Sequence, residues 1–169
     1  MNRVIDRDRG WRNIAQKMQT FRGEAVAGFV AGKGGEVTHD GTALTMAELA
    51  AVHEFGAPSV GIPARPFMRI AVAKDQPKWI RLLNLRIKKY LVPHGSASPS
   101  IVLQPVAESM RSSIVRSITA IRIPPLKLPR RRRGSKRRRG SNPLIDTGAL
   151  RAAINSDVRL GRFRSAPET

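Results

Sequence analysis

The interior of this chain carries a strongly basic stretch that cannot be buried, so any fold must be built from the sequence on either side of it. Residues 122–143 contain ten Lys or Arg and no acidic residue. Unpaired charges are almost never buried, so this stretch has to lie on the surface. Because foldable sequence precedes and follows it, we expect an arginine-rich loop insertion that one scaffold holds at both ends.

The length of the chain limits the number of domains, and its charge indicates the kind of partner. Its 169 residues fit a single domain, 1–169, whose net charge of +19 favours a polyphosphate partner. A solvated charge run that only aids solubility is the alternative reading. The chain has no cysteine, which fits a reducing compartment. We expect no signal peptide and no membrane anchor, because no apolar run approaches the roughly 20 residues of a membrane helix.

Helical spacing of apolar residues recurs along the chain, and it predicts helices over residues 11–21, 45–55, 67–92 and 101–121. Thr45 and Glu48 form a capping-box pattern, and Gly56 is expected to end that helix. Pro77 is expected either to kink the third helix or to begin a new one. The two long helices are expected to pair antiparallel. A further short helix is predicted within 144–154, capped by Asp146 or Thr147.

Strands are predicted from shorter apolar runs bounded by glycine. Residues 24–31 give a strand, 32–35 a turn, 36–38 a return strand and 155–160 a closing strand, whereas 57–66 reads as an extended connection and 162–169 as a frayed tail. The expected fold class is α+β: a small antiparallel sheet packed with two long helices and short helices.

The sequence carries no pattern typical of an enzyme, and we expect no catalytic residue, cofactor or metal. The turn Gly32-Lys33-Gly34-Gly35 lacks the second Gly-Lys and the Ser or Thr of a phosphate-binding loop. His53 and Glu54 are adjacent on a helix and point about 100° apart, so they cannot jointly hold a metal. A nuclease built from distant carboxylates stays open as a minor alternative.

The basic insertion supplies the candidate nucleic-acid contacts. Residues 122–143 contain no Phe, Tyr or Trp on which bases could stack, so we expect sequence-independent contact with the phosphate backbone. The candidate DNA-contact residues are Lys127, Arg130, Arg131, Arg132, Arg133, Lys136, Arg137, Arg138 and Arg139.

Two stretches outside the insertion resemble a known family. Met46-Ala-Glu-Leu-Ala-Ala-Val-His-Glu-Phe-Gly56, followed by Ile62-Pro-Ala-Arg-Pro-Phe-Met-Arg69, resembles neck and tail-completion proteins of tailed bacteriophages. Asn142-Pro-Leu-Ile-Asp-Thr-Gly-Ala-Leu-Arg151 is similar to the Asp-Thr-Gly signature of the same group. The resemblance covers roughly residues 24–160, and a loop this rich in arginine departs from the family's pattern.

The resemblance implies a non-enzymatic subunit of the virion, assembled in the host cytoplasm and located at the neck or head-proximal tail end. It implies a homo-oligomeric ring, with a hexamer favoured, that joins the capsid connector to the tail tube, with non-specific contact to genomic DNA. The candidate subunit-interface residues are Phe55, Arg65, Pro66 and Phe67. Packing of this run against its own chain is the equal alternative. A free-standing nucleic-acid-binding protein is the competing function.

Overall fold

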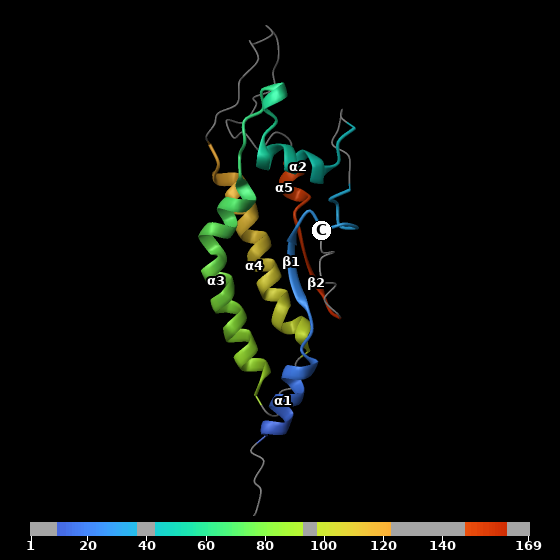
Figure 1. Cartoon of the computed structure of the whole chain (residues 1–169), viewed down its shortest axis with the longest axis vertical. Coiled ribbons are helices and arrows are strands. Elements are labelled where there is room, and N and C mark those ends of the chain that lie inside the picture. Colours follow the sequence, from blue (N-terminus) through green and yellow to red (C-terminus); the bar gives the residue numbers. More distant parts are fainter. Residues whose placement is uncertain (1–9, 37–42, 93–97, 123–147, 162–169) are drawn as a thin grey trace, which may run out of the picture.

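Two long helices packed against a two-stranded sheet are the main elements of the described residues, as a computed structural model shows (Figure 1). The structure describes residues 10–36, 43–92, 98–122 and 148–161. Its elements are α1 (Trp11–Thr20), β1 (Glu24–Gly28), α2 (Met46–Phe55), the 3-10 helix η1 (Pro58–Val60), α3 (Phe67–Tyr90), α4 (Pro99–Ala120), α5 (Ala149–Ala152) and β2 (Asn155–Arg159). The α+β prediction is confirmed.

Helices α3 and α4 lie side by side and antiparallel, as predicted (Figure 1). Near mid-length the Trp79 indole donates to Ser113 Oγ at 3.3 Å, and Arg116 bonds Asp75 Oδ2 at 3.1 Å. Helix α3 is continuous through Pro77, so the expectation of a new helix beginning there is wrong. Packing against α4 over the whole length holds the helix together where proline removes one backbone hydrogen bond.

The sheet joins segments far apart in the sequence. Strand β1 pairs antiparallel with β2, from Glu24 opposite Arg159 to Gly28 opposite Asn155. Of the predicted return strand 36–38, Glu36 belongs to a turn, and residues 37 and 38 lie outside the described residues. A glycine turn signals a reversal of the chain, but it does not decide which strand provides the ladder.

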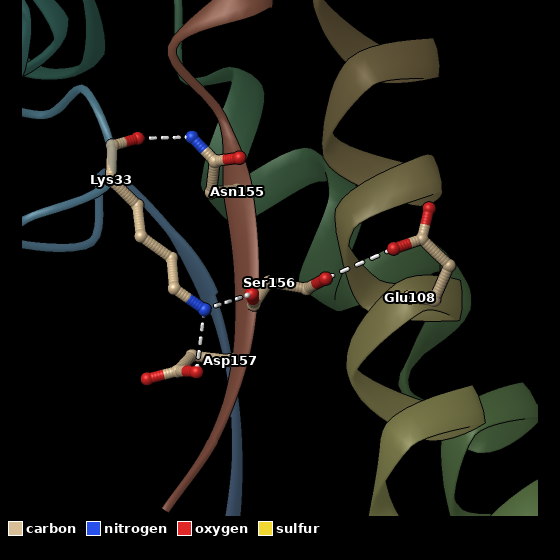
Figure 2. A network of polar contacts seen from close by, with 5 residues as sticks. All are labelled: Lys33, Glu108, Asn155, Ser156 and Asp157. Atoms are coloured by element: carbon tan, nitrogen blue, oxygen red, sulfur yellow. Dashed lines mark hydrogen bonds and ion pairs between the residues drawn. The ribbon is translucent and has the colours of Figure 1, made fainter.

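Helix α4 covers one face of this sheet (Figure 2). Ser156 Oγ donates to Glu108 Oε2 of α4 at 2.9 Å, whereas Lys33 Nζ bonds Asp157 Oδ1 at 2.7 Å on the opposite face. The Asn155 side-chain amide also donates to the carbonyl of Lys33, which ties the turn after β1 to the start of β2. Alternation along β2 therefore separates an α4-facing side from a polar outer side.

The short elements lie at the two ends of the long helices. Helix α1 lies by the C-terminal end of α3, where Lys17 Nζ donates to the Tyr90 carbonyl at 3.1 Å. Helices α2 and α5 lie at the other end. The capping box at Thr45 and the stop at Gly56 are confirmed. The 57–66 connection contains η1, so it is not wholly extended. The N-cap of α5 is Gly148, not Asp146 or Thr147.

Candidate nucleic-acid interface

All nine predicted DNA-contact residues, from Lys127 to Arg139, lie outside the described residues. Of the predicted insertion 122–143, the structure describes only Arg122. Its guanidinium donates to the Thr119 carbonyl at 2.6 Å, which fixes this side chain against the last turn of α4. The structure therefore shows only the residues that flank the undescribed segment 123–147: those up to Arg122 and those from Gly148 onward.

Residues on both sides of this segment belong to one hydrophobic cluster. Ile121, two positions before residue 123, is 9% exposed, and Leu150, three positions after residue 147, is 6% exposed. Each packs in the cluster that also holds Ile114, Ile118 and Ile154. The described chain therefore ends before residue 123 and resumes after residue 147 at the same end of α4 (Figure 1). On each side of this segment a buried aliphatic side chain packs in the core.

A groove lined by three arginines lies beside this point. We call it the arginine groove; it is an open cavity of about 480 Å³ lined by Arg111, Ser112, Val115, Arg116, Gly148, Arg151 and Ala152. It lies between α4 and α5 and contains no acidic residue in its lining. A second, larger hollow adjoins it, shares Val115 and Arg116 with it, and adds Lys74, Asp75 and Arg122.

Hydrogen bonds hold two of the three guanidinium groups. Arg111 Nε donates to the Ile154 carbonyl at 2.9 Å, and its Nη1 donates to Glu108 Oε1 at 3.1 Å. Arg116 Nη2 donates to Asp75 Oδ2 at 3.1 Å and to Ser113 Oγ at 2.9 Å. Arg151 is exposed and makes no hydrogen bond or ion pair with another described residue.

The nearby Asp75 carboxylate stays ionised. A hydrogen bond from Ser113 and the guanidinium of Arg116 hold the pKa of Asp75 below its ordinary value. The charge that holds Arg116 in place therefore persists to lower pH than that of an ordinary aspartate.

The candidate subunit-interface residues divide into two kinds. Phe67 is completely buried in its own chain, edge-to-face with Phe29 at 6.4 Å between ring centroids, and Arg65 is only 3% exposed. Pro66 is half-buried, whereas Phe55 is 69% exposed. The Arg65–Phe67 run thus packs within its own chain, the alternative that the sequence left open. Phe55 is the one of the four whose side chain stands out to solvent.

Glu54 has a structural role that the sequence did not reveal. It is 4% exposed, and its carboxylate accepts from the backbone N–H groups of Met68 at 2.9 Å and Arg69 at 3.1 Å. Arg69 Nε adds a third bond at 3.1 Å. Pro66, the N-cap of α3, offers no side-chain acceptor. Glu54, which lies on α2, accepts the hydrogen bonds of those N–H groups instead. In the sequence, the proline before α3 was the one signal that this helix needs a cap from elsewhere in the chain.

Two further observations concern metals and membranes. Within the described ranges, no three His, Cys, Asp or Glu side chains gather where they could hold a metal ion. None of the helices in that part of the chain is long and apolar enough to cross a membrane.

A scan against protein-family models and searches of curated proteins and of solved structures found no match to this chain. The resemblance to phage neck proteins therefore rests on the quoted motifs alone and stays a prediction.

Proposed function

We propose that this protein is a structural subunit of the neck or head-proximal tail end of a tailed bacteriophage virion. In this proposal it forms a homo-oligomeric ring between the capsid connector and the tail tube and presents its basic segment to DNA in the channel. The observation that carries the proposal is that Ile121 and Leu150, on either side of residues 123–147, share one core cluster beside an arginine-lined groove.

Charge supports a polyanionic neighbour. Several copies of a segment carrying ten basic residues would crowd together in a closed ring and repel one another. Contact with phosphates removes that repulsion and releases condensed counterions. A ring of such subunits is therefore better suited to surround nucleic acid than to remain empty.

Exposed apolar side chains support assembly with other subunits. Helix α1 buries none of its residues, and Trp11 and Met18 on it are 70% and 60% exposed. At the other end of the molecule, Phe55 and Val60 are 69% and 70% exposed. Large exposed aromatic and aliphatic side chains at both ends are typical of surfaces that a protein partner covers.

The proposal is tested by replacing Arg130 to Arg133 and Arg137 to Arg139 with Ser. We expect the variant to fold and assemble as the wild type does, because Ile121 and Leu150 are unchanged, but to join heads to tails poorly and to retain DNA poorly. If each ring neutralises about five phosphates, log affinity of wild-type rings for DNA falls with log salt at a slope near −4.5. Salt-independent binding, or full function of the variant, would refute the DNA contact.

A free-standing nucleic-acid-binding protein is the second candidate, favoured by the arginine groove because one chain forms it alone. Light scattering with and without DNA separates the two. A stable monomer that binds DNA tightly and associates with no connector or tail component would replace the ring proposal by this one.

A further inference from the structure

The arginine groove brings together guanidinium groups that are held in place yet keep most of their donors. Arg111 uses one hydrogen on Nε and one on Nη1, and Arg116 uses only Nη2. Each guanidinium carries five N–H donors, so several donors on each remain for a ligand. Arg151 keeps all of its donors with respect to the described residues.

The bonds that hold these side chains lower the cost of binding an anion. An arginine loses about 2 kcal/mol of rotamer freedom when it is fixed, and Arg111 and Arg116 have already lost part of it in the free protein. The Ile154 carbonyl holds Arg111 from the end of the buried core, and Asp75 holds Arg116 from α3. An incoming anion thus meets a prearranged pair and one adaptable partner, Arg151.

The charge balance favours an anion. Across the groove and the adjoining hollow there are five basic side chains, Lys74, Arg111, Arg116, Arg122 and Arg151, against the two acids Asp75 and Glu108. Both acids are already paired within the protein, Glu108 with Arg111 and Asp75 with Arg116. Ser112 in the groove lining adds a hydroxyl donor.

We propose that the arginine groove is a phosphate-binding site that takes a phosphodiester group of a nucleic-acid backbone. The assignment of nucleic acid as the source rests on the proposed function, whereas the phosphate chemistry rests on the groove. Planar guanidinium groups match the oxygens of a phosphate in paired hydrogen bonds, and this recognition carries no base sequence. The site would hold the nucleic-acid backbone beside Gly148, the first described residue after 123–147.

The first test measures whether the full-length protein binds phosphate in this groove. Inorganic pyrophosphate and a short duplex DNA are titrated separately while NMR follows the guanidinium Nε signals. Both titrants are expected to shift Arg111, Arg116 and Arg151 together with one affinity, and to shift Arg81, on the exposed surface of α3, much less. Equal shifts on every arginine would mean diffuse attraction and would overturn the site. Shifts at the groove with pyrophosphate alone would overturn nucleic acid as its ligand.

The second test uses matched charge changes. Arg116→Gln with Arg151→Gln removes two groove charges. Arg81→Gln with Lys89→Gln removes two charges from exposed positions of α3 that form no hydrogen bond or ion pair with another described residue. The groove variant is expected to bind duplex DNA at least about tenfold more weakly and to lose about one unit of salt slope per arginine. The control is expected to lose less than threefold. Equal losses in both variants would overturn the site.

These outcomes separate the two proposals. A monomer that binds DNA through the groove but joins no virion component leaves the site standing and removes the neck function. A ring that joins heads to tails while the groove variant binds DNA like the control leaves the neck function standing and removes the site. Arg151→Gln alone, which breaks no bond to a described residue, covers the case in which loss of the Arg116–Asp75 ion pair unfolds the double variant.

Discussion

The connection between α2 and α3 depends on individual residues. Gly56 is one of them, because both its backbone angle and the space around its Cα exclude a side chain. Its φ is +78°, and a Cβ added there would lie 2.7 Å from the Ala64 backbone nitrogen and 3.0 Å from the Ile62 carbonyl oxygen. Neither backbone atom can move without shifting the connection that leads to Phe67. Glycine is therefore required here for both its backbone angle and its missing side chain.

Replacing Gly56 by Ala should destabilise the protein by about 2 kcal/mol or more, because the strained backbone and the close contact act together. Chemical denaturation measures the change. Gly61→Ala is the matched control: its φ is +71°, but no atom lies within 4 Å of the added Cβ, so only the backbone term of roughly 1 kcal/mol remains. Equal losses would show that the contact with Ala64 contributes nothing.

Glu54 is the second residue on which this junction depends. The Glu54 carboxylate accepts three hydrogen bonds from Met68 and Arg69. Glu54→Gln keeps the side-chain shape but removes the charge and one of the two acceptor oxygens, so it should lower the free energy of unfolding by about 2 kcal/mol. Glu24→Gln, which weakens a solvent-exposed ion pair to Arg159, should cost less than about 1 kcal/mol. Denaturation midpoints of the two variants decide the matter, and a Glu54→Gln protein as stable as the control would contradict this role.

Among the helices, α3 contains a proline in its interior, where proline is unfavourable to helical structure. Pro77 is exposed, lies well inside a continuous helix and cannot donate the backbone hydrogen bond of its turn. The rest of the helix is held by α4, through Trp79 and Asp75 among others. The proline thus costs stability that tertiary packing offsets.

Pro77→Ala should stabilise the protein by about 1–2 kcal/mol, since the gain of a helical N–H exceeds the added freedom of the unfolded chain. Thermal melts provide the measurement. Pro99→Ala is the control, because Pro99 begins α4, where proline is well tolerated, and its replacement should change little. A Pro77→Ala protein that melts at a lower temperature would mean that the helix depends on a bend at this position.

Sequence patterns predicted the helices well where neighbouring residues determine how a helix begins, ends and packs. The Thr45–Glu48 capping box and the Gly56 stop are satisfied within one helix, and the spacing of Ile114, Ile118 and Ile121 places all three in one core cluster. The partner of β1 was not predictable in this way. It lies more than 120 residues away at Asn155–Arg159, and only the packing of both strands on α4 brings them together.

The whole molecule is strongly basic, and this makes its stability sensitive to acid. Hydrogen bonds lower the pKa of Glu48, Asp75 and Asp157, and at the two aspartates nearby basic side chains lower the pKa further. A carboxylate whose pKa is lower in the folded state adds stability above its unfolded pKa, about 4, and loses it as pH falls through the folded value. Acid then removes these attractions and leaves the repulsion among the basic groups.

The midpoint of thermal unfolding should accordingly be flat near neutral pH and drop below about pH 4. Asp75→Asn with Asp157→Asn should lower the midpoint at neutral pH and make the drop shallower, because two of the titrating groups are gone. Asp157 bonds Lys33 and Asp75 bonds Arg116, so both losses are of defined ion pairs. A midpoint in the double variant that falls with acid as steeply as in the wild type would contradict this assignment.

The sequence alone determined the α+β class, the two long helices and the capped α2, because each depends on local periodicity or caps, and it predicts a basic insertion from charge. Only the tertiary structure decided the rest: that β1 pairs with β2, that Phe67 packs inward, that Glu54 caps α3, and that Arg111, Arg116 and Arg151 meet in one groove. Such features need residues distant in sequence to share one core, and no local pattern encodes which of them will meet.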